Sequence, residues 1–431
     1  MADHADYDRI RVLWPDHLGL ARGKYLPRRY ADRGAFHCMS LFALGYDRGM
    51  TPTPASKMLE GLPDLHATFD MDDLRLGWEP NTAVAVADIW FRGDPVDVSA
   101  RHALKRAIAA WEELGYTPKI GIELEAFILQ RSDDGQSWVP WETPGGYVYG
   151  TGTAVDPIGL LDEIMREAED ANLPIESINS EYDIPQFELT LHYDDAMKAL
   201  DDAFLFKVLA REIAHRHGLL MTFLGKPMGD RGGSGLHVNV SISDGDGNNL
   251  LNDTDADDGL SSLARRMIAG MLAHHEGMTA LLAPTVNAYK RLGPGTLTGY
   301  WANWGYDHRG VTVRVSPERG APLRLEHRTA DGSANMYIAA AAVLQAALLG
   351  VTGELELQPA ETDDCLETSD TEVTCPATLR DALDALEADT ELTEAVGSAL
   401  CEHHVIIKRA EWERFARHVT DWELNEYLPF H

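Results

Sequence analysis

The segment Gly121–Leu129, GIELEAFIL, limits the folds open to this chain more than any other, because it sets two carboxylates in an apolar stretch. Side chains alternate between the two faces of a β-strand, so Glu123 and Glu125 share one face and apolar side chains share the other. Neighbouring carboxylates repel each other, and a metal cation beside them relieves the repulsion. An edge strand with its acidic face in water is the alternative, and this motif alone does not decide between the two.

A second acidic cluster is Glu181–Glu188, EYDIPQFE, with Glu176 just upstream. Glu181 and Glu188 are too far apart in sequence to share a helical or strand face through local geometry alone. They converge only if a turn, most simply at Pro185, folds the segment back on itself. Solvated acidic side chains are the alternative interpretation of this cluster.

A third cluster is the stretch Lys226–Ser243, KPMGDRGGSGLHVNVSIS, in which a glycine-rich turn at 232–235 runs into a predicted strand. His237, Asn239 and Ser241 share one face of that strand. Glycines let backbone amides approach a ligand closely, and the sequence here lacks the GxxxxGK[ST] pattern of a P-loop. A single strand histidine is more often structural than a metal ligand, but the glycine turn aimed at three polar side chains indicates a ligand.

A fourth cluster spans 287–328 and is rich in arginine, which suits bidentate contacts with carboxylates and phosphates. Alternation along the predicted strand 323–327 and into the next residue places Arg324, Glu326 and Arg328 on one face. A cross-strand salt-bridge ladder would explain the pattern without any ligand. The concentration of cations in a chain of net charge -32 nevertheless indicates an anionic ligand, and the arginines concerned are Arg291, Arg309, Arg314, Arg324 and Arg328.

Composition narrows the class of protein. A formal charge of -32 argues against nucleic acid as a partner, because phosphate would be repelled. Lysine is scarce beside arginine, while aspartate and glutamate are abundant. This composition suggests a solvated acidic surface of the kind found on proteins of salt-loving organisms.

The four cysteines form no CxxC pair, so neither a zinc site nor a disulfide framework is indicated. The charged N-terminus has no apolar core and the longest apolar run, Met336–Gly350, is too short for a bilayer, so we expect a cytoplasmic protein with no membrane partner.

At 431 residues the chain is long enough for two or three domains, and strands alternate with helices after a β-rich start. The pattern predicts an α+β fold: a small N-terminal domain at 1–99 and a larger domain at 100–431, with helices packed on a largely antiparallel sheet. Two acidic stretches, 252–258 and 361–372, are expected to be solvated loops. Predicted strands are 82–90, 120–129, 186–191, 236–242, 311–315 and 323–327, and predicted helices are 100–114, 158–171, 196–217, 260–282, 334–349 and 377–387.

Taken in order, these clusters resemble the glutamine synthetase family, in particular its γ-glutamyl-polyamine and γ-glutamyl-amide synthetase branch. The matching blocks cover nearly the whole chain. They are WPDHLGLARGKYLP, GIELEAF, EYDIPQFE, GKPMGDRGGSGLHVNVS, NAYKRLGPG, DHRGVTVRV, LRLEHRTADGSANMYIAAA and the terminal KRAEWERFARHVTDWELNEYL. The resemblance implies a small N-terminal β-grasp domain, a larger catalytic domain, and a homo-oligomeric ring, often a dodecamer, with active sites shared between subunits.

The resemblance also implies ATP as cosubstrate and two catalytic metal ions, Mg²⁺ or Mn²⁺, and such hard cations suit oxygen ligands. By motif, Glu125, Glu181 and Glu188 would hold one ion, and Glu123, His237 and Glu326 the other. Arg291, Arg328 and Gly233 would bind glutamate, with the two arginines also meeting the transferred phosphoryl group. The residues expected near ATP are Arg309, Arg314, Arg324, Asn239 and Ser241, with Arg309 taking part in phosphoryl transfer.

Departures from the family pattern fall on the nucleophile side. Family members carry a glutamate in the flap, where it shields the intermediate and deprotonates the nucleophile, whereas this chain has Leu297. The ammonium pocket of true glutamine synthetases, an Asp-Gly-Ser-Ser stretch, is matched poorly by LFALGYDRGM. Asp47 or Asp183 would be the candidates to replace the missing base. Gly232 and Asn239 stand where an asparagine and a second histidine are common.

These features predict an ATP-dependent ligase that phosphorylates the glutamate side chain and transfers it to an amine, such as a polyamine or a small alkylamine. An ordinary glutamine synthetase that uses ammonia is the first alternative. A non-catalytic paralogue that regulates nitrogen metabolism is the second alternative. The leucine in the flap allows this interpretation, but the retained metal-binding residues argue against it. A guanidino kinase shares the catalytic fold, but the NAYKR and DWE blocks match the synthetases better.

Overall fold

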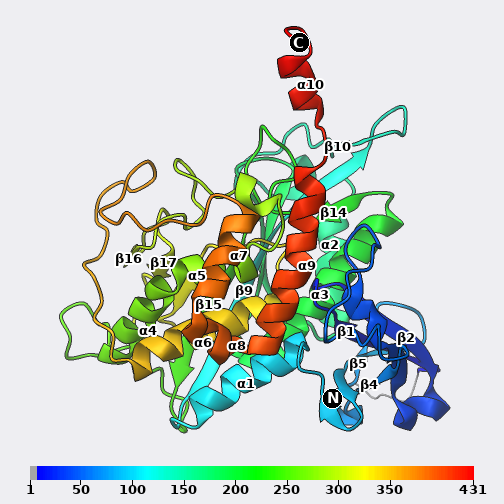
Figure 1. The fold of residues 1–431 in the computed structure, drawn as a ribbon, viewed down its shortest axis with the longest axis horizontal. Coiled ribbons are helices and arrows are strands. Elements are labelled where there is room, and N and C mark those ends of the chain that lie inside the picture. Colours follow the sequence, from blue (N-terminus) through cyan, green and yellow to red (C-terminus); the bar gives the residue numbers. More distant parts are fainter. Residues whose placement is uncertain (1–6) are drawn as a thin grey trace.

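A computed structural model describes residues 7–431 and shows a small β-rich part packed against a larger mixed part (Figure 1). The N-terminal part holds two four-stranded sheets, with strand orders β2-β1-β6-β5 and β3-β4-β7-β8. Apolar residues of both sheets, among them Trp14, Phe42 and Leu65, form its core. The strands are β1 Arg9–Pro15, β2 Ala21–Pro27, β3 Ala35–Cys38, β4 Asp64–Thr68, β5 Arg75–Leu76, β6 Thr82–Val86, β7 Asp88–Phe91 and β8 Asp94–Pro95.

The single strand predicted at 82–90 is wrong, because the chain changes sheets at Ala87. β6 pairs in parallel with β1 as far as Val86, and β7 pairs with β4 from Asp88 onward. The Ala87 amide still donates to the Leu13 carbonyl, so no turn residue marks the change. The chain therefore changes from one sheet to the other within a continuous apolar run. The position of the change depends on pairing with β1 and β4, which the local sequence does not reveal.

The larger part is built on a ten-stranded sheet with the order β11-β12-β9-β15-β18-β17-β16. β10, β13 and β14 also pair with the long central strand β9, and β16 with β17 is the parallel pair. The predicted strands at 120–129, 186–191, 236–242, 311–315 and 323–327 all lie in this sheet. Its strands are β9 Thr117–Arg131, β10 Trp138–Pro140, β11 Ile175–Ser180, β12 Gln186–Leu191, β13 Asp194–Asp195, β14 Leu220–Thr222, β15 Leu236–Ser243, β16 Trp304–Tyr306, β17 Val313–Val315 and β18 Leu325–His327.

Helices cover the sheet, and the Ala-rich helix predicted at 334–349 is α6, Met336–Thr352, which is buried along most of its length. Glycines let α4 approach it: a Cβ on Gly270 would lie 2.1 Å from the Ala346 carbonyl oxygen. No helix within residues 7–431 is long and apolar enough to cross a membrane. The other helices are α1 Ala100–Glu112, α2 Leu160–Asp170, α3 Ala196–Arg216, α4 Ser262–Ala273, α5 His275–Leu282, α7 Leu379–Ala388, α8 Thr390–Val396, α9 Ser398–Ala416 and α10 Asp421–Tyr427.

The single helix predicted at 260–282 is also wrong, because it breaks into α4 and α5 at His274. His274 leaves the helical region at φ -102° and ψ 17°, and its Nδ1 lies 2.8 Å from a carboxylate oxygen of Asp389. A tertiary contact from the start of α8 thus accompanies the break. The acidic stretches 252–258 and 361–372 are loops, as predicted, and all four cysteines are free.

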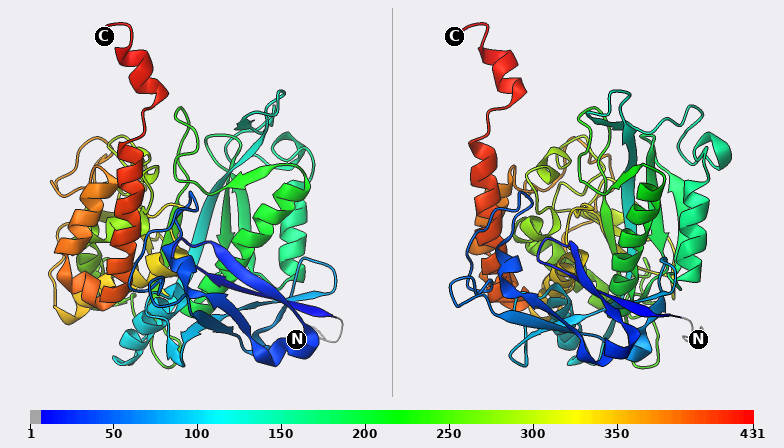
Figure 2. Two further views of the ribbon diagram at one scale, coloured as in Figure 1. Left: turned by 45° about the vertical axis from the view of Figure 1, so that its right-hand side comes forward. Right: turned by 90° about the vertical axis from the view of Figure 1, so that its right-hand side faces the viewer.

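The two parts are joined by buried contacts, although the domain boundary at residue 99 stays a prediction. Leu13 and Trp78 of the N-terminal part belong to the larger core. Asn335, the N-cap of α6, donates its side-chain amide to the Asp16 carbonyl at 2.8 Å. Figure 2 shows the N-terminal sheets lying against α3 and the segment that follows β3 running beside α9.

Beyond α9 the chain leaves the body, and α10 stands clear of it at the C-terminus (Figures 1 and 2). Several large apolar side chains of this C-terminal arm, 417–431, are exposed, and Trp422 is 64% and Phe430 is 81% exposed. Exposed apolar side chains gathered on one segment are typical of a protein–protein contact.

Candidate active site

Strand register brings the four charged clusters of the sequence onto one face of the large sheet. Glu123 of β9 stands opposite His237 of β15, and Glu125 of β9 stands opposite Glu188 of β12. One strand further, Asn239 of β15 pairs with Glu326 of β18. Directly opposed residues in an antiparallel sheet project to the same side, so these chain segments share one polar face.

His237 lies at the centre of this carboxylate cluster. Its Nδ1 is 3.1 Å from Oε2 of Glu123 and 3.4 Å from Oε1 of Glu326, and its Nε2 is 3.7 Å from Oε1 of Glu125. Ligand atoms of Glu123, Glu188 and His237 all lie within 4.8 Å of one another. Glu188 belongs to one of the two metal-binding sets expected from the resemblance, and Glu123 and His237 belong to the other. The two expected metal sites therefore lie next to each other.

The turn expected at Pro185 brings Glu181 back to the same face. The Glu181 amide donates to the Gln186 carbonyl at 2.8 Å, and the Gln186 amide donates to the Asp183 carbonyl at 2.9 Å. Burial and the charge of Glu125 raise the pKa of Glu181, while burial and the charge of Glu123 raise the pKa of Glu188 to about 7. These shifts arise because the carboxylates are crowded together away from water.

This donor set fits divalent magnesium or manganese. Several carboxylates and one imidazole converge in a partly buried position, where a bound cation would offset the mutual repulsion that raises the pKa of Glu188. Oxygen-rich ligation favours hard cations of this kind. The geometry of the donors is thus compatible with the metals expected from the sequence.

Two of the arginines line the inner end of this face. The Arg328 guanidinium forms an ion pair with Glu326, and its Nη2 donates to the Leu297 carbonyl at 3.2 Å. Arg291 is buried and donates to the carbonyls of Thr329, at 2.8 Å, and Arg328, at 3.3 Å. Burial lowers the pKa of Arg291.

The other three arginines differ in their surroundings. Arg314 pairs with Glu326 at 3.0 Å, so it joins the metal face. Arg324 donates its Nε to Oδ1 of Asn239 at 3.2 Å. Arg309 is exposed in the turn between β16 and β17 and has no hydrogen-bond or ion-pair partner within residues 7–431. The structure therefore gathers four of the five predicted arginines around the sheet face and leaves Arg309 at its edge.

The glycine turn packs too tightly against this site to carry a side chain. A Cβ on Gly233 would lie 2.5 Å from the Gly225 carbonyl oxygen and 2.7 Å from Cγ of Arg291. Gln186, a residue that sequence reasoning did not single out, donates to the Gly233 carbonyl at 2.8 Å. Its position could have identified it, because Gln186 lies two residues before Glu188 on β12 and so projects to the same face of the strand.

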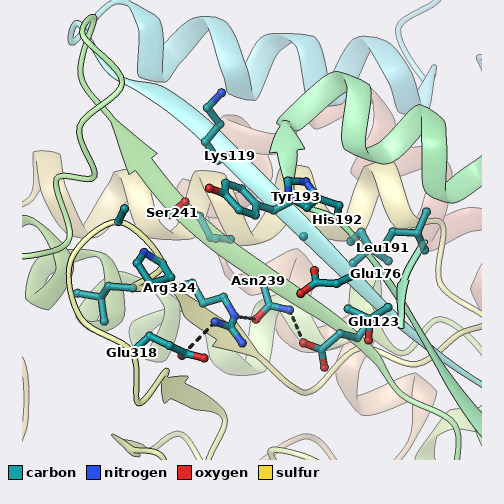
Figure 3. A pocket seen from close by; sticks show the side chains of 17 residues that line it. Lys119, Glu123, Glu176, Leu191, His192, Tyr193, Asn239, Ser241, Glu318 and Arg324 are labelled. Atoms are coloured by element: carbon teal, nitrogen blue, oxygen red, sulfur yellow. Dashed lines mark hydrogen bonds and ion pairs between the residues drawn. The ribbon is translucent and has the colours of Figure 1, made fainter. Parts of the chain in front are cut away.

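A cavity of about 240 Å³ opens beside the metal cluster, and Asn239, Ser241 and Arg324 line it (Figure 3). Asn239 bridges the two features, since its Nδ2 donates to Glu123 at 2.8 Å while its Oδ1 accepts from Arg324. Neither Arg309 nor Arg314 lines the cavity. Lining residues that sequence reasoning did not assign to a ligand include Lys119, Glu176, His192, Tyr193 and Glu318.

The flap segment, 293–299, closes one side of the cluster and is held through its carbonyl groups. Arg328 donates to the Leu297 carbonyl, and Thr329 Oγ1 donates to the Gly299 carbonyl at 3.0 Å. Just beyond the flap, Thr312 Oγ1 donates to the Trp301 carbonyl. The Leu297 side chain itself is 51% exposed.

Neither candidate for the missing base contacts the flap through a described hydrogen bond. Asp47 pairs with Arg414 of α9 at 3.0 Å. Asp183 accepts a hydrogen bond from the Gly232 amide, which places it beside the glycine turn.

Comparison with known proteins accounts for this arrangement. The family described as "Glutamine synthetase, catalytic domain" matches residues 97–427. The chain belongs to the glutamine synthetase family, and it is therefore an enzyme of the ATP-dependent ligase class.

Individual relatives include both ordinary and altered members. A glutamine synthetase from Halobacterium salinarum is 31% identical, over 98% of this chain and 93% of that protein. The γ-glutamylethanolamide synthetase GlnA4 from Streptomyces coelicolor is 33% identical, over 97% of this chain and 92% of that protein. A glutamate–isopropylamine ligase from Pseudomonas sp. is 30% identical, over 85% of this chain and 82% of that protein.

A solved structure supports the same fold. The structure titled "GmaS/ADP complex-Conformation 1" superposes with a TM-score of 0.85 at 30% identity, over 99% of this chain and 98% of that one. The predicted α+β architecture, with a small N-terminal β-domain before the catalytic domain, is confirmed, as is the resemblance stated from the motifs.

Proposed function

We propose that this enzyme joins the side-chain carboxylate of glutamate to a primary amine with a short carbon chain, at the expense of ATP. The observation that carries the proposal is Leu297. It occupies the flap position where a glutamate is expected, and its side chain is half-exposed rather than packed in the core. A leucine cannot accept a proton, but it can contact the methylene groups of an amine.

In the first step, an oxygen of the glutamate side chain attacks the γ-phosphorus of ATP, and ADP leaves. Arg291 and Arg328 would hold the glutamate carboxylates and the transferred phosphoryl group, and Gly233 would offer its backbone to the amino acid. Glu123, Glu125, Glu181, Glu188, His237 and Glu326 would hold Mg²⁺ or Mn²⁺. When bound, such cations neutralise charge that develops on the phosphoryl oxygens.

The nucleotide would lie in the cavity of Figure 3, with Asn239, Ser241 and Arg324 as contacts. Arg314 would act indirectly by fixing Glu326, and Arg309, which is exposed, would have to move to reach a phosphate. In the second step the neutral amine nitrogen attacks the acyl carbon of the phosphorylated glutamate, the bond to phosphate breaks, and the nitrogen passes a proton to the leaving phosphate or to water. Two relatives support this acceptor class, since the name of one specifies an amide product and the name of the other an amine substrate.

The experiment is a measurement of phosphate release with ATP, Mg²⁺ and glutamate against ammonium, methylamine, isopropylamine, ethanolamine and polyamines, with mass detection of products. We expect a γ-glutamyl-amide to form with a higher kcat/KM than glutamine. Glutamine formation with ammonium at least as efficient as any amide formation would refute the proposal. ATP binding without turnover on any acceptor would instead favour a regulatory paralogue.

An ordinary glutamine synthetase is the second candidate. The Halobacterium salinarum relative, which matches over nearly the whole chain, favours it. Leu297 would then be a tolerated change, and the same panel of acceptors would distinguish the two activities.

We also propose a cytoplasmic homo-oligomeric ring, a dodecamer by analogy with the family. The exposed apolar residues of the C-terminal arm support self-association, because such a surface is costly in water. Removal of residues 417–431 should lower the assembly mass in light scattering, and an unchanged mass would exclude a role for the arm.

The net charge of -32 supports a further proposal, adaptation to high salt. High salt screens repulsion among surface carboxylates, so the unfolding midpoint should rise in molar KCl. A midpoint that is unchanged or lower in molar KCl would rule the adaptation out.

A further inference from the structure

A second cavity, of about 380 Å³, lies where the N-terminal part meets the catalytic part. The turn after β1, at 18–21, forms one wall, and α3 forms another. The remaining walls come from 222–224, 285–287 and 332–333, together with Tyr46 and Glu411. None of its lining residues lines the cavity beside the metal cluster, so this is a separate space.

Two cations of α3 line this domain-junction cavity: Lys207 and Arg211. They are four residues apart in the helix and so lie on the same side, one turn from each other. Neither has an ion-pair partner within the part of the chain that the structure describes.

The Lys207 ammonium is only partly satisfied. It donates one hydrogen bond, to the Gly332 carbonyl, and lies 5.1 Å from the ring centroid of Phe223. Burial and repulsion from Arg211 lower the pKa of Lys207 to about 8. The charge of the buried Asp331 attracts the Lys207 ammonium, but the two groups form no described ion pair. Glu411 also lines the cavity, but its carboxylate is paired with Lys408 at 2.9 Å. An anionic ligand in the cavity would therefore be a direct ion-pair partner for Lys207 and Arg211.

The rest of the lining is largely apolar and includes Leu18, Leu20, Phe204, Phe223 and Val286. Inorganic phosphate alone would leave these side chains without a partner. A ligand with one acidic group and an apolar body would satisfy both the cations and the walls, since apolar contact and charge-assisted hydrogen bonds reinforce each other.

The cavity walls are continuous with two segments of the active site. The Asn287 side chain exchanges two hydrogen bonds of 2.8 Å with the Lys226 backbone, at the start of the stretch that leads to Gly233. Gly332 and Ser333 directly follow the segment that carries Arg328. A ligand in the cavity would therefore contact residues that position the glutamate site.

We propose that the domain-junction cavity is a binding site for a small organic anion, one carboxylate or phosphate on an apolar body, and that its occupancy is coupled to glutamate binding. Lys207 and Arg211 hold the acidic group, and the apolar walls hold the body. By thermodynamic reciprocity, glutamate and the anion change each other's affinity by the same factor.

The test uses 3-phenylpropionate and phenyl phosphate as probes, titrated calorimetrically into the full-length enzyme with ADP and Mg²⁺ saturating. The neutral analogue 3-phenylpropanol controls for apolar binding alone, and inorganic phosphate controls for charge alone. We expect the Arg211→Met and Lys207→Met variants to bind the anionic probes about tenfold or more weakly, as loss of a charge-assisted hydrogen bond predicts. Arg166→Met on α2, which also removes an exposed arginine, should bind them as the parent does.

Arg211 is exposed and takes part in no described hydrogen bond, so its variant should fold and keep basal activity. Coupling is tested by repeating the titration with saturating glutamate, which should change the probe affinity by a measurable factor in the parent enzyme. Absence of probe binding to the parent, equal binding of the neutral analogue, or unchanged affinity in Arg211→Met would overturn the site. Identical probe affinity with and without glutamate would overturn the coupling.

Discussion

The two halves of the active site are built from different kinds of structure. The half proposed for phosphoryl transfer lies on β9, β12, β15 and β18, where hydrogen-bonded register fixes each charged side chain against its neighbours. The half proposed to receive the acceptor is the flap, an irregular segment held at its carbonyl groups by Arg328 and Thr329. In the first half the side chains are fixed, and in the second half the backbone is fixed while the Leu297 side chain is free.

This difference suggests how one family changes its nitrogen substrate. A substitution on a strand disturbs several buried charges at once, because each is the partner of another. A substitution at a flap side chain leaves the carbonyl anchors in place, because those contacts do not involve the side chain. The acceptor can thus vary while phosphoryl transfer is retained, and four variants test this separation.

The largest effect is expected for Glu326→Gln. Glu326 pairs with Arg328 and Arg314 and lies 3.4 Å from His237, so the change removes a charge shared by three partners. We expect kcat to fall by about 10²–10³-fold with every acceptor, the size of effect that loss of an electrostatic contact in an active site produces. Mn²⁺ affinity, followed by electron paramagnetic resonance, should fall as well.

Glu167→Gln is the matched control, because Glu167 of α2 forms a partly exposed pair with Arg216 and lines neither cavity. A Glu326→Gln enzyme that lost activity with amines but kept it with ammonium would contradict the separation of the two halves.

The second variant, Leu297→Glu, restores an acid to the flap. A general base contributes about 10²–10⁴-fold to rate when it is well placed, so a partial gain of about tenfold in kcat/KM for ammonium is expected. Activity with bulkier amines should fall, and Mn²⁺ affinity should stay unchanged. Leu297→Gln, similar in size but without a carboxylate, separates the effect of the base from that of shape. Equal gains in kcat/KM for ammonium in the two variants would show that the missing proton transfer is not what limits the parent enzyme.

Sequence alone predicted the strand half better than the flap half, for physical reasons. Alternation along 121–129 and 236–242 identified the face of each strand, but not the register that sets Glu123 opposite His237. Register depends on partner strands, as did the sheet switch at Ala87. The flap anchor Thr329 went unrecognised, as did Thr312, which holds the backbone just beyond the flap. Both act through hydrogen bonds to irregular backbone, which leave no periodic signal.

The third variant, Gly233→Ala, tests the glutamate pocket that we propose between the two halves. The added Cβ would lie 2.5 Å from the Gly225 carbonyl oxygen, so backbone has to move. Overpacking of this kind costs about 1–3 kcal/mol, and we expect KM for glutamate to rise about tenfold. Gly229→Ala is the control, because nothing lies within 4 Å of the position its Cβ would take. Equal effects of the two changes would assign the result to chain flexibility instead of close packing.

The smallest effect is expected for Thr329→Val, which keeps the shape of the side chain and deletes its hydrogen bond to the Gly299 carbonyl, 3.0 Å long. One such bond contributes about 1 kcal/mol, so kcat/KM for the amine should fall about fivefold. Because Thr329 follows Arg328 directly, a general disturbance of β18 would also weaken metal binding. If the flap is held independently, Mn²⁺ affinity and KM for ATP will match those of the parent enzyme. A parallel loss of Mn²⁺ affinity would mean that the flap and the metal-binding strands are structurally coupled. The acceptor could not then change without affecting phosphoryl transfer.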